Sequence, residues 1–152
     1  MKAKAKPRKK RPPEPINLDG HWYEVQKRLW LEITGKVPES PNLSMGRHAH
    51  WSTASKIAQL WRARIQIAVA ASNLPGRPPC DHKRVAVTVW QTRRRTLDPD
   101  NLVGSVKPVL DALRNCDAIK DDTAEYLTLE VLQKVRPKSE GPVVTEISVQ
   151  YA

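Results

Sequence analysis

The sequence predicts one α+β domain, with a mixed sheet of about four strands and two helices, preceded by a basic disordered leader. Three observations support this prediction. Several short segments alternate apolar and polar residues, two longer segments repeat apolar residues at helical spacing, and the first residues carry almost no apolar side chains. A chain of 152 residues is long enough for one domain, or for one domain and a tail.

The first half of the domain is predicted to contain a strand, a helix and a second strand. Residues 28–37 alternate in the way that a half-buried strand requires. Residues 52–72 form an amphipathic helix, because apolar side chains recur there at three- and four-residue steps. Residues 83–92 are predicted to be a strand with its valines on one face. The helix positions are Ile57, Leu60, Trp61, Ile65, Ala68 and Val69.

The second half is predicted to contain a helix and two further strands. The helix ends near Asn115 and buries Val106, Leu110 and Leu113, while residues 126–135 and 143–151 alternate as strands do. The loop between these two strands suits a hairpin. Residues 18–28 fit neither pattern, so the expected element order is β-α-β-α-β-β.

The amino-terminal leader is expected to be disordered, because residues 1–15 are rich in Lys, Arg and Pro and offer no core. We place the leader at residues 1–17 and the folded domain at residues 18–152. Such a leader is either a basic arm that adds affinity for DNA through counterion release or a solubilising extension without a specific role. Its basic residues are Lys2, Lys4, Lys6, Arg8, Lys9, Lys10 and Arg11.

Charge and composition restrict the partners. The formal net charge is +10 and the pI is about 9.9, which favours a polyanion such as nucleic acid or an anionic membrane. No apolar run is long enough to span a bilayer, and the basic start lacks the apolar segment of a signal peptide. The two cysteines form no disulfide framework or metal motif. We therefore expect a cytoplasmic protein with no membrane partner.

The stretch "TRRRTLDPDN" at residues 92–101 contains the candidate chemistry. Asp98 and Asp100 follow a strand and precede a helix, where Asp and Pro are common simply because they start helices. The functional alternative is a divalent-metal site, since two carboxylates at this spacing can converge on one Mg²⁺ that also binds phosphate. Phosphodiester hydrolysis needs an activated water and charge neutralisation, which metal ions supply. Arg93, Arg94 and Arg95 would then hold the phosphate.

A second acidic pair, Asp121 and Asp122, precedes the predicted strand at residues 126–135. Alone this pair is typical of a turn. It would complete a carboxylate cluster with Asp98 and Asp100 if that strand lies beside the strand that ends near Gln91.

The run "RRRTLDPDNLVGSVKPVLDALRNCDAIKDDTAEYL", residues 93–127, resembles the RusA family of Holliday-junction resolvases, which is common in phages and prophages. The shared pattern is a basic run, D-x-D-N, a lysine, a D-A-L helix segment and a D-D pair before a strand. The loop "PESPN" at residues 38–42 is also similar to a loop of that family. The resemblance covers about residues 29–152 and excludes the leader.

The resemblance implies a small α+β homodimer in the bacterial host cytoplasm, associated with the nucleoid. It would cut four-way (Holliday) DNA junctions symmetrically, using Mg²⁺ or Mn²⁺, in DNA recombination and repair. By position, Asp98, Asp100 and Asp122 match the metal-binding catalytic aspartates, and Lys107 matches the essential lysine. Lys107 also joins Arg93, Arg94, Arg95 and Lys120 as an expected DNA-binding residue. In one member of the family, the lysine follows the second aspartate by four residues, whereas Lys107 follows Asp100 by seven.

The three extra residues predict a break in the helix. An unbroken helix from Asp100 would place Pro108 in its interior, at a cost of about 3 kcal/mol. We expect Ser105 to cap a new helix that begins at Val106, which puts Pro108 in the first turn and keeps Lys107 near the metal. Asp111, one turn later, is expected to be structural or to orient Lys107.

Two alternatives remain open at this stage. A non-catalytic protein of the same fold that binds branched DNA would use the acidic residues only as helix caps. RNA binding has less support, because no aromatic stacking platform is visible and Phe is absent.

Overall fold

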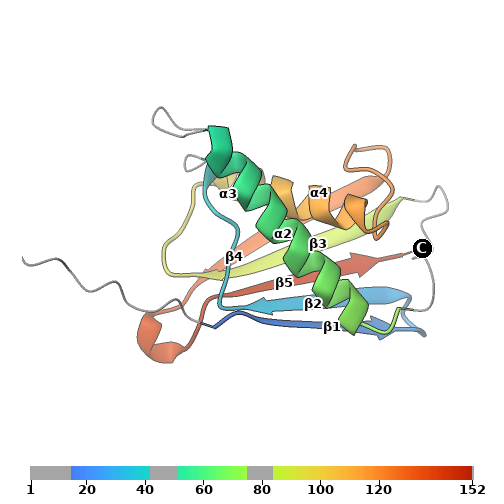
Figure 1. Cartoon of the computed structure of the whole chain (residues 1–152), viewed down its shortest axis with the longest axis horizontal. Helices are drawn as coiled ribbons and strands as arrows, with labels where there is room; N and C mark the ends of the chain where they lie inside the picture. Colours follow the sequence, from blue (N-terminus) through green and yellow to red (C-terminus); the bar gives the residue numbers. More distant parts are fainter. Residues whose placement is uncertain (1–14, 42–50, 75–83, 152) are drawn as a thin grey trace, which may run out of the picture.

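The computed structural model describes residues 15–41, 51–74 and 84–151. Within these ranges, a five-stranded sheet carries its α-helices on one face (Figure 1). The elements, in chain order, are β1 (Asn17–Tyr23), β2 (Arg28–Thr34), α2 (Trp51–Ala71), β3 (Val85–Arg93), α3 (Pro99–Ser105), α4 (Lys107–Asn115), β4 (Leu127–Val135), the 3₁₀ turn η1 (Lys138–Glu140) and β5 (Val144–Gln150).

The sheet has the strand order β1-β2-β5-β3-β4. Strands β3 and β4 are parallel, and all other neighbours are antiparallel. The predicted α+β class with a mixed sheet is confirmed, and so are the predicted strands at β2, β3, β4 and β5.

The additional strand is β1, which begins inside the range predicted to be leader and which alternation alone did not reveal. Its sequence, "NLDGHWY", contains Asp and Gly, two residues that are depleted in strands. Gly20 is required by packing, because a Cβ there would lie 2.2 Å from the backbone oxygen of Ala68 in α2. Strand β1 is thus held by pairing with β2 and by close contact with α2.

The core lies between the sheet and helices α2 and α4. The alternating residues of β2, β3 and β5 point into it, as do one face of α2 and the predicted face of α4. None of the helices in the described ranges has the length and apolar composition needed to cross a bilayer. Fully or almost fully buried positions include Leu29, Leu31, Ile33, Trp61, Ile65, Val87, Val89, Val106, Leu113, Ile147 and Val149.

The predicted hairpin between the last two strands is wrong. β4 pairs with one edge of β3, whereas β5 pairs with the other edge of β3 and with β2. The connection contains η1 and is long enough to pass around the end of β3. Because β4 is parallel to β3, a chain that returns along the far edge of β3 pairs with it in the antiparallel direction.

The predicted helix break is confirmed, but its cap is not the one expected. α3 ends at Ser105 and α4 begins at Lys107, with Val106 between them and Pro108 in the first turn of α4. No side chain caps α4. The Ser105 hydroxyl instead donates to the Leu102 carbonyl (2.6 Å) and accepts from the side chain of Gln91 (3.2 Å).

Candidate active site

The aspartates of the D-x-D motif lie at the amino-terminal end of α3. Asp98 is the N-cap: its Oδ1 accepts the backbone N–H of Asn101 (3.0 Å) and its Oδ2 accepts the Asn101 side-chain amide (2.6 Å). The side chain of Asp100, in the first turn, makes no hydrogen bond or ion pair with the described part of the chain. Both residues are exposed.

The ionised form of the Asp98 carboxylate is stabilised by the start of α3. The backbone N–H of Asn101 lowers the pKa of Asp98 below its ordinary value, and the side chain of Asn101 adds to this effect. Asp100 is an exposed carboxylate. No lysine or arginine from the described ranges forms an ion pair with either residue, so their negative charge is not compensated within the fold.

The loop before Asp98 is fixed by Gln133 of β4. The Gln133 side chain accepts the backbone N–H of Leu97 (2.9 Å) and donates to the Leu97 carbonyl (2.7 Å). An amide that pairs with both backbone groups of one residue holds that residue much as a neighbouring strand would. The start of the D-x-D segment is thereby joined to the edge of the sheet.

A buried chain of polar groups holds α3 from the other side. Arg93 donates to the Pro38 carbonyl (2.7 Å) and to Gln91 Oε1 (2.5 Å), and Gln91 donates to Ser105 in α3. Arg93 is only 8% exposed. Its predicted role as a phosphate-binding residue is therefore corrected. The guanidinium is hydrogen-bonded within the fold, where it connects the 38–41 loop to β3 and, through Gln91, to α3.

The remaining predicted DNA-binding residues keep exposed or partly exposed positive charge. Arg95 is exposed, and Arg94 is half-buried with its guanidinium bonded to two backbone carbonyls. Lys120 is also half-buried, with its ammonium 4.5 Å from the centre of the Tyr126 ring. Lys107 has a side chain that is 59% exposed, at the amino-terminal end of α4.

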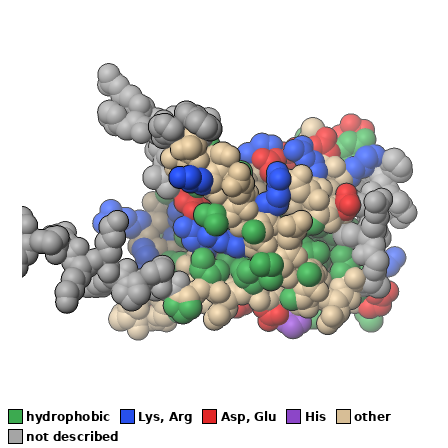
Figure 2. Space-filling view, in the orientation of Figure 1, with side chains coloured by type: hydrophobic (Ala, Val, Ile, Leu, Met, Phe, Trp, Pro, Cys, Tyr) green, Lys and Arg blue, Asp and Glu red, His purple; other side chains and the backbone are tan. Residues whose placement is uncertain are grey.

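Lys107 is the centre of an ion-pair network along α4. Its ammonium contacts the carboxylate of Asp122 and lies 3.1 Å from that of Asp111, one helical turn away. Arg114 joins the same network, 3.5 Å from Asp111 and 3.6 Å from Asp122. Figure 2 shows acidic and basic side chains mixed in this way along the upper part of the helix-covered face, where Figure 1 places α4.

The network changes the pKa of Lys107 and that of Asp122. The hydrogen bond with Asp122 raises the pKa of Lys107, and the same hydrogen bond lowers the pKa of Asp122. Sequence reasoning anticipated the contact between Lys107 and Asp111 but missed Arg114. The three-residue spacing from Asp111 to Arg114 was the available signal.

The predicted three-aspartate cluster is not assembled in the described ranges, where no three Asp, Glu, His or Cys side chains lie close enough to share a metal ion. The topology gives the reason. β4 does lie beside β3, as the prediction required, but the pairing is parallel and matches Val85 with Leu127. Residues that follow β3, such as Asp98, and residues that precede β4, such as Asp122, therefore leave opposite ends of the paired strands.

Lys107 and Asp111 also line a pocket of about 210 Å³ between α2 and α4, together with Glu39. Glu39 accepts the indole N–H of Trp61 (2.9 Å) and lies 2.8 Å from the Lys36 ammonium. Burial alone would raise the pKa of Glu39, but the hydrogen bonds from Lys36 and Trp61 outweigh it and the pKa is lowered. This half-buried carboxylate was not recognised from sequence, because an isolated Glu in a proline-rich loop carries no pattern.

No protein-family model matches the chain, and no curated protein shows significant similarity to it. The functional argument therefore depends on the residues of this chain and on their arrangement.

Proposed function

We propose that this protein is a Mg²⁺- or Mn²⁺-dependent, structure-selective endodeoxyribonuclease that cuts four-way DNA junctions by paired symmetric nicks. One observation carries most of the proposal. Asp98 and Asp100 are exposed and have no cationic partner in the described ranges, in a chain whose net charge is +10. Uncompensated carboxylates on a strongly basic protein suit a divalent cation that is bound together with a phosphate.

The residues present fit such a cation. Asp98 and Asp100 are acceptor-only carboxylates, and Mg²⁺ needs only one or two of them, with waters and phosphate oxygens completing its shell. When bound, the cation supplies an activated water and neutralises charge that develops on the phosphate. Asp122 is proposed as the third ligand by resemblance. In this structure its carboxylate is paired with Lys107, so binding the metal would require it to leave that pair.

The basic residues would bind and orient the DNA. Arg95 and Lys120 are the candidates for contacts to phosphate, and Lys107 would place its positive charge against the phosphate that is cut. Asp111 and Asp122 hold the Lys107 ammonium from two sides, which keeps it charged and fixes its position. The protein would act in DNA recombination or repair in the bacterial cytoplasm.

Symmetric cutting needs two sites related by a two-fold axis, and a homodimer with one site per protomer provides them. We expect a dimer by sedimentation at assay concentrations. A monomer that nicks only one strand would contradict junction resolution and indicate a simple nickase.

The second candidate is a non-catalytic protein that binds branched DNA. Its specific support is the N-cap role of Asp98, since both carboxylate oxygens of that residue already accept hydrogen bonds from Asn101. Incubating a labelled four-way junction with the protein in Mg²⁺, in Mn²⁺ and in EDTA separates the candidates. The nuclease cuts only with a divalent cation, whereas the binding protein shifts the junction in a gel under all three conditions without cutting it.

A further inference from the structure

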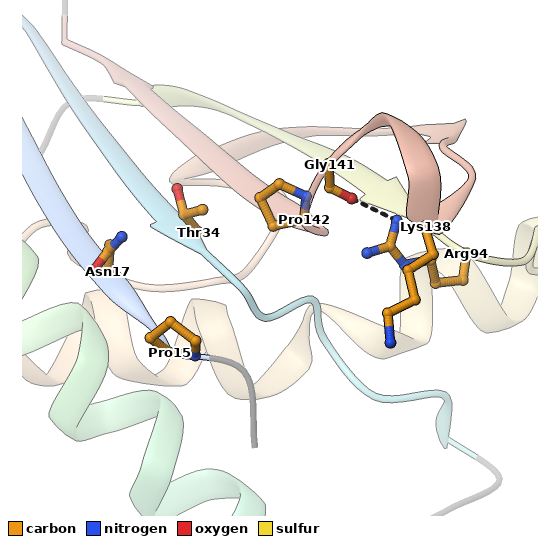
Figure 3. Close-up of a pocket in the computed structure, with 7 residues that line it drawn as sticks. All are labelled: Pro15, Asn17, Thr34, Arg94, Lys138, Gly141 and Pro142. Carbon is orange, nitrogen blue, oxygen red and sulfur yellow. Dashed lines mark hydrogen bonds between the residues drawn. The ribbon is translucent and has the colours of Figure 1, made fainter. Parts of the chain in front are cut away.

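A pocket of about 310 Å³ lies where the amino-terminal end of β1, the end of β2 and the β4–β5 connection meet. Its charged lining residues are Arg94 and Lys138, and none of the lining residues in the described ranges is acidic. Figure 3 shows these two side chains on one side of the pocket, with Pro15 and Asn17 across from them. The remaining lining residues are Thr34, Gly141 and Pro142.

The guanidinium of Arg94 is held in place by the protein backbone. One of its terminal nitrogens, Nη1, donates to the Gly141 carbonyl (2.7 Å) and to the Arg136 carbonyl (3.1 Å). The other guanidinium nitrogens have no hydrogen-bond partner in the described ranges. An arginine oriented in this way presents its remaining donors in a fixed fork, which is the geometry that phosphate oxygens accept.

The backbone conformation of the β4–β5 connection supports the position of Arg94. Gly141 has a φ of +129°, a conformation that side-chain-bearing residues rarely adopt, and its carbonyl accepts the shorter of the two arginine hydrogen bonds. Arg136 donates to the Pro142 carbonyl (3.1 Å) and so supports the same connection. The Arg94 guanidinium is therefore held in a defined position at the pocket.

The pocket lies close to the proposed cutting site. Arg94 and Asp98 are four residues apart, so their Cα atoms are separated by at most about 14 Å. The chain also enters the described fold at Pro15, which lines the pocket and follows the basic leader.

We propose that this pocket binds a phosphate group of the nucleic-acid backbone, on the same strand as the phosphate that is placed at Asp98 and Asp100 and near to it. Arg94 would contact the phosphate through its remaining donors, and Lys138 would supply a second positive charge. The position of the cut relative to this phosphate rests on the proposed nuclease function. The pocket itself requires only that the ligand carry a phosphate.

The test measures DNA binding in EDTA, where no cutting can occur. The wild type, Lys138→Gln and the control Lys27→Gln are titrated with a four-way junction between about 50 and 200 mM salt, the range over which phosphate contacts are lost. Both substitutions remove one exposed lysine charge, but Lys27 lies in the turn between β1 and β2, at the opposite end of β1 from the pocket. Lys138→Gln should reduce the slope of log K against log salt by about 0.9, the value for one phosphate contact, and Lys27→Gln should leave it unchanged.

A second arm uses inorganic phosphate against chloride at equal ionic strength, followed by the amide resonances of Gly141 and Thr34. Saturable shifts in the wild type that weaken in Lys138→Gln, together with the reduced slope, support the backbone phosphate. Shifts without a change in slope mean that the pocket takes a small phosphate compound and overturn the nucleic-acid part. If neither the shifts nor the change in slope is observed, the proposed phosphate site is overturned. If the wild type binds no DNA, the proposed function fails, and the phosphate titration alone decides whether the pocket is a site.

Discussion

The two groups of aspartates in this protein differ in how their charge is compensated. Asp98 and Asp100 are exposed, and no lysine or arginine in the described ranges pairs with them. Asp122 is mostly buried and is paired with Lys107 and Arg114. A carboxylate that is paired within the fold contributes to structure and orients its partner, whereas two carboxylates without a cationic partner in the described ranges are available to an external cation.

Substitutions in the unpaired group are expected to have the largest effect. Asp98→Asn and Asp100→Asn should each reduce junction cleavage by about 10³-fold, since loss of one preorganised transition-state contact alone costs 10²- to 10³-fold. Junction binding should be unchanged or tighter, because a negative charge near phosphate is removed. Cleavage is measured at saturating protein, and binding is measured in EDTA.

The Asp98 variant also separates catalysis from folding, because Asn is as good an N-cap as Asp and the melting temperature should hardly change. The matched control is Asp117→Asn, at an exposed position just after α4 with φ of +57°, which Asn tolerates well. Wild-type cutting by either motif variant would remove that residue from the site.

Substitutions in the paired group should lower the cleavage rate by a smaller factor, and we expect Asp122 to act by positioning Lys107. Lys107→Ala is expected to lower the cleavage rate by about 100-fold, as for a lost transition-state charge contact. Lys107→Arg keeps the charge and should recover part of that loss. If Asp122 acts only by holding Lys107, then Asp122→Asn should add little in the Lys107→Ala background. Full additivity of the two losses would instead support Asp122 as a metal ligand, and normal cutting by Lys107→Ala would exclude the lysine.

Deleting residues 1–14 should affect binding and leave the chemistry intact. Seven basic residues are lost, and if even three of them contact phosphates, the salt slope falls by about 2.7. The rate of cutting per bound complex should stay within about twofold, because the leader holds none of the proposed catalytic groups. An unchanged salt slope would show that the leader does not touch DNA.

The smallest predicted effect is on stability. The pKa of Asp122 is lowered in the folded state, so its pairing stabilises the protein above the unfolded value of about 3.9 and is lost as pH falls through the folded pKa. The pKa of Lys107 is raised, so its contribution is complete below about 10.4 and is lost as pH rises through the folded pKa. The lysine is 59% exposed, so solvent screening limits the pair to about 1 kcal/mol.

Urea unfolding of the wild type and of Asp122→Asn measures the pH range over which the Lys107–Asp122 pair stabilises the fold. The difference in unfolding free energy should be present at pH 7 and should be smaller at about pH 3, because below the unfolded pKa of about 3.9 protonation of the unfolded chain already reduces the contribution of the pair. An equal difference at both pH values would mean that the ion pair does not stabilise the fold.

The sequence predicted the features that depend on local pattern. Alternation found the strands β2, β3, β4 and β5, and Pro108 indicated the break between α3 and α4. The sequence did not predict that β5 joins the far edge of β3, because the residues of the β4–β5 connection contain no information about which edge of β3 the next strand reaches. Strand β1 was missed because its sequence contains Asp and Gly, and it is held by pairing with β2 and by the close approach of Gly20 to α2.

The candidate site was predictable as a set of residue types but not as an arrangement. The basic run suggested three equivalent arginines, yet only the fold shows that Arg93 is buried against Pro38 while Arg95 is exposed. The D-D pair was expected to meet the D-x-D motif. The parallel pairing of β3 with β4 sets these motifs at opposite strand ends and leaves Asp122 beside Lys107.

The most direct test of the central claim compares a synthetic four-way junction with a linear duplex of matched sequence, in Mg²⁺, with each strand labelled in turn. The proposed function predicts nicks in two opposed strands at symmetric positions on the junction, no comparable cutting of the duplex, and loss of both nicks in Asp100→Asn. Equal cutting of the junction and the duplex would contradict structure selectivity. Binding of the junction without any cutting, in either Mg²⁺ or Mn²⁺, would contradict the nuclease assignment.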